Sequence, residues 1–329
     1  METIELSTTG RRTTRLGYGC SSLMGAMGHR DSVALLEAAF DAGVRHFDVA
    51  PMYGFGQAES CVGEFAARHR GHVTVTTKFG IAPPKRQGLV SVARSVARPV
   101  LRALPGLKKG MLQVASRTAA PAARAKFSVA EAQASLERSL KELRTERVDV
   151  WLLHEATVDD LKDDGLLRML EDAVAAGKIG AFGVGSERAR AERLMAERPE
   201  YCPVAQFEWS VMDETVGETA SFRIHHRALT DNFRSLHAAL AGDAAKASRW
   251  STEVGADLRD RHVLAALMLK AALVENPGSV VLFSSKSVQH MQRNAATAEA
   301  GELAEPARRL YALVRRELDG VKAAMAVAG

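Results

Sequence analysis

The feature of this sequence that most restricts its fold is a regular alternation of short apolar runs with amphipathic segments. Eight runs have the length and the β-branched or aromatic content of buried strands, and helical spacing of apolar residues separates most of them. The eight expected strands are residues 16–20, 44–48, 73–78, 148–153, 179–184, 204–208, 220–224 and 280–283. Alternation of this kind is typical of parallel β/α units.

Turn and capping residues mark where several of these elements begin and end. Asp31 is a candidate helix N-cap and Gly43 a candidate C′ residue, while "SVAE" from Ser128 has the capping-box pattern. The expected helices are residues 31–42, 128–143, 161–176 and 258–274. Before the first barrel strand, "IELSTTGRRTTRL" predicts a β-hairpin with its turn at Thr-Thr-Gly.

Eight β/α units in 329 residues predict a (β/α)8 TIM barrel, whose usual length is about 250 residues plus insertions. A doubly wound sheet is the alternative, and it calls for a G-x-G-x-x-G turn between a strand and a helix. The nearest match, "GYGCSSLMG", lacks the third glycine at the required spacing. We therefore expect a single barrel domain over residues 1–329.

A long basic insertion, residues 80–127, interrupts the pattern after the third strand. No Asp or Glu occurs between residues 65 and 130, and ten Lys and Arg lie between residues 85 and 126. Apolar residues recur there at helical spacing with arginines on the opposite face, and Pro99 predicts two short helical pieces. The open interpretations are a solvated excursion, an interfacial amphipathic piece, or a rim or lid that admits a bulky or anionic substrate.

The remaining composition narrows the class of protein. The net charge of +5 is concentrated in the insertion, which argues against a general nucleic-acid-binding surface. No apolar run reaches eighteen residues and the N-terminus lacks a signal-peptide core, so no integral membrane segment is expected. Three well-separated cysteines, Cys20, Cys61 and Cys202, are expected to be buried and reduced, which favours a cytoplasmic protein.

Four residues with complementary acid–base chemistry follow three successive strands. Asp48 ends the second expected strand, Tyr53 follows it in "DVAPMYG", Lys78 ends the third, and His154 follows the fourth. In a β/α barrel the carboxyl ends of the strands meet on one open face. We therefore expect these four side chains to lie together at that face.

The four residue types suit proton transfer to a carbonyl oxygen. A lysine ammonium beside a phenol favours the phenolate and lowers its pKa, and an aspartate keeps the lysine charged and oriented. A histidine beside them positions the substrate oxygen. An alternative is an aldolase with Lys78 as its Schiff-base lysine, although a neighbouring aspartate opposes the lowered lysine pKa that such chemistry needs.

Six segments resemble the aldo-keto reductase family, in the family's order and over most of the chain. They are "FDVAPMYGFGQAE", "TTKFG", "WLLHE", "GAFGVGS", "VAQFEWS" and "VLFSSKSVQHMQRN". The resemblance implies a (β/α)8 barrel that binds NADP(H), with Asp48, Tyr53, Lys78 and His154 as the catalytic tetrad. Within that tetrad, Tyr53 would be the general acid.

The resemblance also implies a set of cofactor-binding residues. Ser186 and Gln206 would hold the nicotinamide carboxamide, and His225 would stack on the nicotinamide. Lys286 would face the adenosine 2′-phosphate, which favours NADP over NAD. The full set is Ser186, Gln206, His225, Ser285, Lys286, His290 and Asn294. The chain departs from the family at "IHHRAL", where an aromatic followed by Ser-Pro-Leu is common, and at Ser284 and His290.

The leading hypothesis is an NADPH-dependent oxidoreductase that reduces an aldehyde, ketone or sugar-type carbonyl. The alternative is an NADP-binding regulatory or scaffolding barrel subunit with little turnover, for which the unusual "IHHRAL" leaves room. No metal is expected, because the chain has no H-x-H or H-E-x-x-H pattern. The sequence does not indicate the substrate, the direction of reaction or the oligomeric state.

Overall fold

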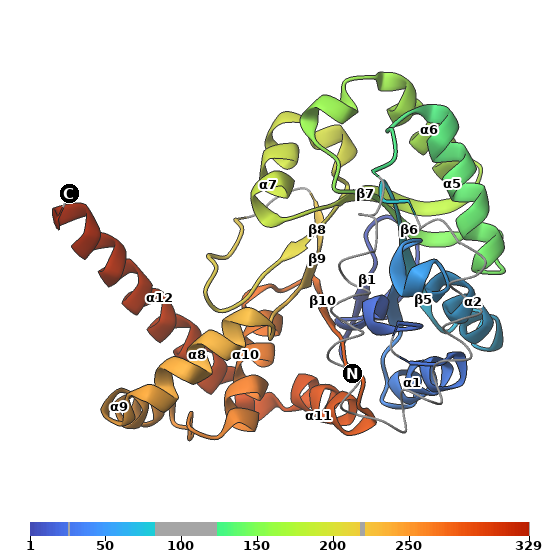
Figure 1. Ribbon diagram of the computed structural model, residues 1–329. Helices are drawn as coiled ribbons and strands as arrows, with labels where there is room; N and C mark the ends of the chain where they lie inside the picture. The colour runs from blue at the N-terminus through green and yellow to red at the C-terminus, as the bar shows by residue number, and fades with distance from the viewer. Residues whose placement is uncertain (26, 83–123, 218–220, 329) are drawn as a thin grey trace, which may run out of the picture.

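Eight parallel strands close into a barrel in the computed structural model of this chain (Figure 1), which describes residues 1–25, 27–82, 124–217 and 221–328. In barrel order the strands are β10 (Val280–Phe283), β3 (Leu16–Gly19), β4 (His46–Asp48), β5 (Thr74–Phe79), β6 (Val148–His154), β7 (Ile179–Gly185), β8 (Val204–Glu208) and β9 (Phe222–His226). The predicted (β/α)8 barrel is confirmed, and each of the eight predicted strands has its counterpart.

The seventh predicted strand was placed two residues too early. It was expected at residues 220–224, whereas β9 is Phe222–His226. Its pairing with β8 continues through Phe207 with His225 and Glu208 with His226. Backbone pairing therefore extends the strand over His225 and His226. The pattern of apolar residues alone does not indicate this extension.

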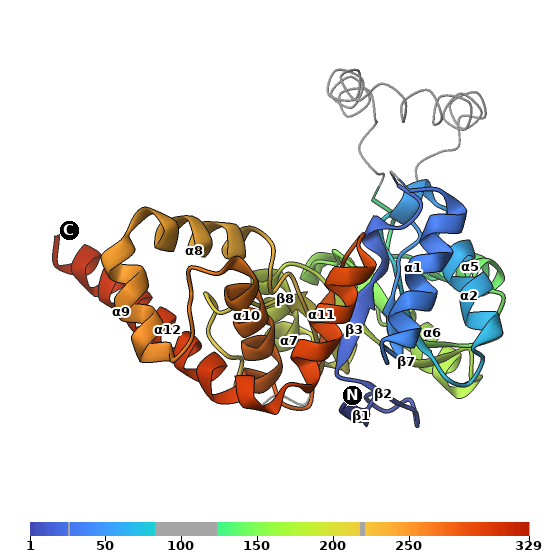
Figure 2. The same cartoon turned by 90° about the horizontal axis from the view of Figure 1, so that it is seen from below.

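The predicted hairpin is present and covers the amino-terminal end of the barrel. Strand β1 (Thr3–Glu5) pairs antiparallel with β2 (Arg12–Thr14), and Figure 2 shows the pair below the barrel. Leu6, which follows β1, is fully buried in one cluster with the apolar side chains of the barrel interior. The other members of that cluster are Val150, Leu152, Ala181, Val204, Ile224, Val280 and Leu282. The hairpin thus closes one end of the barrel with an apolar side chain.

Helices surround the strands as the alternation predicts. Among the described residues, the α-helices that precede β8 are α1 (His29–Asp41), α2 (Ala58–Arg68), α5 (Val129–Glu142), α6 (Asp164–Ala175) and α7 (Arg188–Glu197). Ser128 caps α5 as expected, because its side chain accepts a hydrogen bond from the Glu131 amide. The N-cap of α1, however, is Gly28 and not Asp31, which lies in the first turn. There its carboxylate still interacts favourably with the helix dipole.

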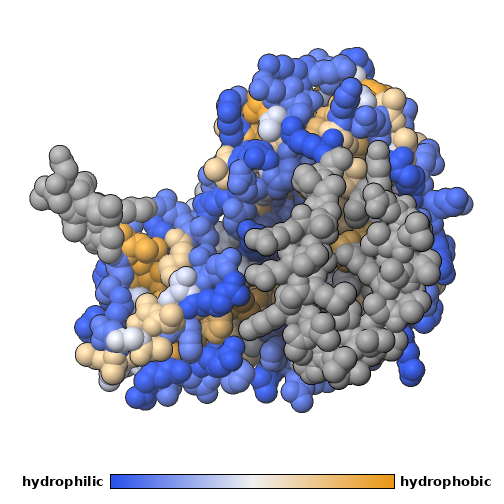
Figure 3. Space-filling model, in the orientation of Figure 1, coloured by the Kyte–Doolittle hydropathy of each residue, from blue (hydrophilic) through white to orange (hydrophobic). Residues whose placement is uncertain are grey.

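The C-terminal helices add a second apolar core beside the barrel. They are α8 (Asp231–Gly242), α9 (Ala244–Val254), α10 (Arg261–Glu275), α11 (Val288–Glu299) and α12 (Ala304–Ala328). Leu240, Trp250, Leu267 and Leu310 pack together in this core, one from each of α8, α9, α10 and α12. The end of α12 extends away from the barrel (Figures 1 and 2), and apolar surface lies near it in the space-filling view (Figure 3).

The two ends of the predicted insertion are held together at the barrel. Ile81 and Arg124 form an antiparallel bridge, and the Ala125 amide donates to the Gly80 carbonyl at 2.8 Å. The insertion's two predicted helical pieces lie outside the described residues. The three cysteines are buried and unpaired, as predicted. No helix in the described part of the chain is both long and apolar enough to cross a membrane.

Candidate functional site

Three of the four predicted catalytic side chains stand at the carboxyl ends of neighbouring strands. Asp48 is the last residue of β4, Lys78 the last but one of β5, and His154 the last of β6. These strands are adjacent and parallel, so their carboxyl ends meet on one face of the barrel. Asp48 and Lys78 are buried, whereas His154 is half-buried.

Asp48 and Lys78 form a buried ion pair. Nζ of Lys78 lies 2.5 Å from Oδ1 of Asp48 and also donates to the Val49 carbonyl at 3.2 Å. The second carboxylate oxygen, Oδ2, accepts a hydrogen bond of 2.7 Å from Nε2 of Gln206. A buried charge is tolerated when it is paired and hydrogen-bonded in this way.

Tyr53 reaches the same place from a turn that follows β4. It begins a short 3-10 helix, Tyr53–Phe55, in which Gly54 and Phe55 have φ of 57° and 58°. Gly54 is required there, because a Cβ would lie 2.5 Å from the Cβ of Met24. The turn leaves Nζ of Lys78 at 5.5 Å from the centre of the Tyr53 ring. The geometry therefore brings the phenol to the buried ion pair.

The electrostatics of Tyr53 differ from the expectation in their net direction. Lys78 acts most strongly on the phenol and lowers its pKa, but burial and the carboxylate of Asp48 together outweigh it, so the pKa of Tyr53 is raised. Burial is the larger of the two raising causes, and Asp48 adds to it by neutralising part of the lysine's charge. Burial opposes the charge of Lys78, yet Asp48 prevails and raises its pKa. A lysine held in its charged form is a poor Schiff-base nucleophile, which disfavours the aldolase alternative.

Two histidines beside the ion pair are held in their neutral form. Burial, helped by Lys78, lowers the pKa of His154 to about 3. Burial also lowers the pKa of His226 to about 4, against the opposing effects of Asp48 and Glu208. A neutral imidazole retains one N–H donor and one acceptor. Both rings are therefore able to hydrogen-bond a substrate oxygen without adding charge to the site.

Ser186 and Gln206, the predicted carboxamide contacts, also lie at the carboxyl-end face. Ser186 follows β7 and Gln206 lies within β8, and both are buried. Oγ of Ser186 donates to Oε2 of Glu155 at 3.1 Å, and the same oxygen lies 2.5 Å from Nη1 of Arg190. The sequence reasoning missed this link, although Glu155 directly follows His154 in "WLLHE".

The structure does not bring His225 to the site. Its ring is fully buried against Phe207, with centroids 4.8 Å apart, and Phe207 belongs to the apolar cluster outside the barrel interior. Side chains alternate along a strand, and Ile224 belongs to the interior cluster, so His226 is the next residue of β9 to face inward. The charges that act on His226 include Asp48 and Lys78. His226 is thus the β9 histidine nearer the proposed catalytic residues, while the stacking of His225 on the nicotinamide stays a prediction of the family resemblance.

The remaining predicted cofactor residues lie together after β10, at the start of α11. Ser285 accepts a hydrogen bond from the Ser287 amide, and Ser287 is the N-cap of α11. Lys286 and His290 are exposed, and Asn294 lies half-buried one turn further along the helix. The first turn of α11 contains no acidic residue. A helix N-terminus with a lysine beside it is suited to binding a phosphate group.

Comparisons with known proteins identify the family to which this sequence is similar. A model of the aldo/keto reductase family matches residues 15–218. Pyridoxal 4-dehydrogenase of Microbacterium luteolum is 40% identical over 78 residues, 23% of either chain. D-threo-aldose 1-dehydrogenase of a Pseudomonas species is 30% identical over 181 residues, 52% of this chain and 49% of that protein. The chain thus matches 23% to 49% of the length of these two curated relatives.

Solved structures resemble the whole fold. An aldo-keto reductase from Klebsiella pneumoniae in complex with NADPH superposes with a TM-score of 0.62 at 20% identity, covering 94% of this chain and 95% of its own. At this identity the likeness shows the fold. The family model covers well over half of the chain, including the strands that carry Asp48, Lys78 and His154. The chain belongs to the aldo/keto reductase family.

Proposed function

We propose that this protein is an NADPH-dependent oxidoreductase that interconverts a carbonyl group and an alcohol, with Tyr53 as the general acid in reduction. The observation that carries the proposal is the buried Asp48–Lys78 pair with Nζ of Lys78 at 5.5 Å from the Tyr53 ring. A phenol beside a fixed ammonium has a stabilised phenolate once its proton has left. This arrangement suits proton donation to an oxygen that becomes an alcohol.

The residues present fit a dinucleotide cofactor. Oε1 of Gln206 forms no hydrogen bond with any described residue, so it is available to accept one from a carboxamide. Lys286 and the N-terminus of α11 supply positive charge for the phosphate of NADP at the other end of the same face, and the His290 side chain lies exposed in the first turn of the same helix. A Klebsiella relative is known in complex with NADPH. When bound, NADPH supplies the hydride.

The protein's own residues then handle the proton. Tyr53 donates its phenolic proton to the substrate oxygen, and Lys78 stabilises the resulting phenolate while Asp48 fixes the ammonium. His154 hydrogen-bonds the same oxygen as a neutral imidazole, because its pKa of about 3 keeps it uncharged at neutral pH. In the reverse direction the phenolate of Tyr53 takes the proton of the alcohol.

The relatives and the charge at the rim support a proposal for the substrate class. Two matched relatives act on pyridoxal and on D-threo-aldose, which are small hydroxylated aldehydes. Arg227, which follows β9, is exposed, and its positive charge acts on both Tyr53 and His226. We therefore propose small hydroxylated aldehydes as the substrates, including ones with an anionic group that Arg227 would attract.

The test is the variant Tyr53→Phe, with Tyr311→Phe on α12 as a matched control. Tyr53→Phe should reduce kcat by about 10²- to 10⁴-fold, the usual range for losing a general acid. NADPH binding, followed by the change in cofactor fluorescence, should be nearly unchanged. Tyr311→Phe removes a phenol that donates to the Asp213 carbonyl, and it should leave kcat unaltered.

Single-turnover loss of nicotinamide absorbance over a panel of hydroxylated aldehydes also separates this proposal from the regulatory alternative. A catalytic barrel oxidises its bound NADPH with at least one member of the panel, whereas a regulatory barrel binds NADPH and retains it. Full turnover by Tyr53→Phe would remove Tyr53 from the mechanism.

A further inference from the structure

Gln206 crosses the mouth of the barrel to reach Asp48. In the closed order of strands, β8 and β4 lie on opposite sides, four positions apart. Nε2 of Gln206 nevertheless lies 2.7 Å from Oδ2 of Asp48, and Gln206 is only 3% exposed. Chemistry settles the orientation of the amide, because an ionised carboxylate only accepts and so requires the N–H side to face it.

The carboxylate of Asp48 is therefore held by one donor on each oxygen. Lys78 donates to Oδ1 and Gln206 donates to Oδ2. Without Gln206, no other described residue hydrogen-bonds Oδ2. A buried carboxylate oxygen that loses its donor costs free energy or turns toward a remaining cation, and here that cation is Lys78.

We propose that Gln206 is a positioning residue for proton transfer: by holding Asp48 from across the barrel, it limits how fully that carboxylate neutralises Lys78. Lys78 in turn sets how readily Tyr53 releases its proton. The link to catalysis rests on the function proposed above. It assigns to Gln206 a role on the protein's own proton donor, in addition to the cofactor contact that the family resemblance implies.

The direction of the effect follows from where the negative charge sits. A donor on Oδ2 draws charge away from Oδ1, so more of the positive potential of Lys78 remains for the phenolate. Loss of that donor returns charge to Oδ1, neutralises Lys78 more fully and makes Tyr53 hold its proton more tightly. A donor on the free Oε1 of Gln206 would polarise the amide and strengthen its bond to Asp48. Binding of a carboxamide to Gln206 would thus make Tyr53 release its proton more readily.

The first test replaces Gln206 with an apolar side chain of similar length, Gln206→Met, with the exposed Gln133→Met on α5 as control. We expect kcat to fall by about 10- to 100-fold, which corresponds to one hydrogen bond to a charged group. The alkaline limb of the pH–rate profile should also move to higher pH, and the control should change neither. A weaker affinity for NADPH with an unmoved limb would show that Gln206 acts only through the cofactor.

The second test needs neither cofactor nor substrate. A double-mutant cycle of Gln206→Met with Asp48→Asn, measured by denaturant unfolding, should be clearly non-additive, because either change alone already removes the charged hydrogen bond. In the free protein, carbon-13 NMR of labelled tyrosine should place the titration of Tyr53 at higher pH in Gln206→Met than in wild type. Additive energies and an unshifted Tyr53 titration would each overturn the proposal.

If Gln206→Met does not fold, Gln206→Glu keeps the size of the side chain. Its protonated carboxyl donates to Asp48 as the amide does, but two ionised carboxylates at this distance repel. Activity should then be present at low pH and fall as pH rises, well before the alkaline limb of wild type. An unaltered profile would contradict the role of Gln206. The double-mutant cycle and the NMR titration involve no turnover. Their results can therefore be interpreted even if Tyr53→Phe remains active and the proposed function fails.

Discussion

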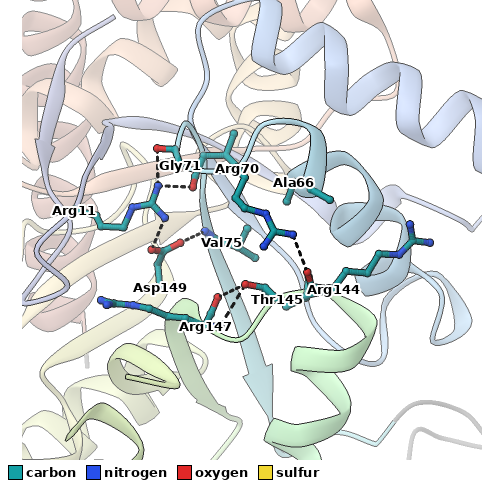
Figure 4. Close-up of a pocket in the computed structure, with 12 residues that line it drawn as sticks. Arg11, Ala66, Arg70, Gly71, Val75, Arg144, Thr145, Arg147 and Asp149 are labelled. Carbon is teal, nitrogen blue, oxygen red and sulfur yellow. Dashed lines mark hydrogen bonds and ion pairs between the residues drawn. The ribbon is translucent and has the colours of Figure 1, made fainter. Parts of the chain in front are cut away.

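A buried aspartate paired with a cation occurs at both ends of this barrel, and the two pairs have different surroundings. At the carboxyl end, Asp48 pairs with Lys78 beside Tyr53 and two neutral histidines. At the amino-terminal end, Oδ1 of Asp149 lies 3.1 Å from Nη1 of Arg11, which comes from the hairpin (Figure 4).

The amino-terminal pair has its hydrogen bonds satisfied by the backbone. Oδ2 of Asp149 accepts from the Val75 amide at 2.7 Å, and Nη2 of Arg11 donates to the carbonyls of Gly71 and Val73 at 2.9 Å each. Arginine does not lose its proton in proteins. Around this pair, a cavity of about 70 Å³ is lined by further arginines and by no tyrosine or histidine. The pair ties the hairpin to the barrel, and nothing beside it can exchange a proton near neutral pH.

The largest expected difference between the two pairs is in turnover. Lys78→Met should lower kcat by about 10²- to 10⁴-fold, because Tyr53 loses the cation that stabilises its phenolate. Arg11→Met should leave kcat per folded molecule unchanged, because its guanidinium serves only the far end of the barrel. Steady-state kinetics normalised to folded protein by circular dichroism measure both. Comparable losses in the two variants would refute the division into a catalytic and a structural pair.

At the amino-terminal end, substitutions are expected to lower the stability of the protein and not its turnover. Asp149→Ala should lower the free energy of unfolding by about 3 kcal/mol, because the buried Val75 amide loses its acceptor and Arg11 its partner. Asp149→Asn should cost less, since its amide oxygen still accepts from Val75. Burial raises the pKa of Asp149, although Arg11 and the Val75 amide oppose the shift. Urea unfolding of the two variants measures their free energies of unfolding. An equal loss in Asp149→Ala and Asp149→Asn would contradict this prediction.

A third prediction concerns the loss of stability in acid. It tests His46, which lies between the two ends of the barrel. His46 lies two residues before Asp48 on β4, is fully buried, and has its ring nitrogens 3.1 Å and 3.3 Å from the hydroxyls of Thr74 and Thr76. Burial lowers its pKa to about 4. Between about pH 6.5 and pH 4, His46 therefore binds a proton in the unfolded chain but not in the folded protein. Stability falls as pH falls through this window.

Between about pH 7 and about pH 5 this group alone should cost about 2 kcal/mol of stability. His46→Gln should remove that part of the acid loss, while the other buried histidines contribute equally in both proteins and cancel. Urea unfolding of wild type and variant at the two pH values measures the difference. An equal acid loss in both proteins would mean that His46 is protonated in the folded state.

The arrangement at the carboxyl end of the barrel could be predicted from the sequence, whereas the ion pair at the amino-terminal end could not. Asp48, Lys78 and His154 each follow an apolar run whose strand character is clear, and barrel topology alone then brings them to one face. The pair Arg11–Asp149 joins residues 138 positions apart, from a hairpin and from a strand interior. Nothing in the local pattern around either residue indicates that contact.

Two features of the site depend on details that patterns do not encode. The contact from Gln206 to Asp48 exists because the barrel closes with β8 opposite β4, which places two strand ends within reach of one side chain. Which of His225 and His226 faces inward depends on the register of β9, since a shift of one residue reverses which side chain faces inward. Register and closure are properties of the assembled sheet, so single segments do not indicate them.

The smallest expected effect tests whether Lys78 depends on the packing outside the barrel. Thr77 precedes it on β5 and donates through Oγ1 to Oε1 of Glu59 at 2.7 Å, beside a cavity of about 450 Å³ between α2 and α5. Thr77→Val should lower stability by about 1 kcal/mol at neutral pH, since buried Glu59 loses a donor that holds its raised pKa down. Turnover should not change, because Asp48 and Val49 hold Nζ of Lys78 from the inner side. A fall in kcat beyond about tenfold, in protein shown to be folded, would mean that the outer layer also positions Lys78. The catalytic pair would then share with Arg11–Asp149 a dependence on the surrounding scaffold.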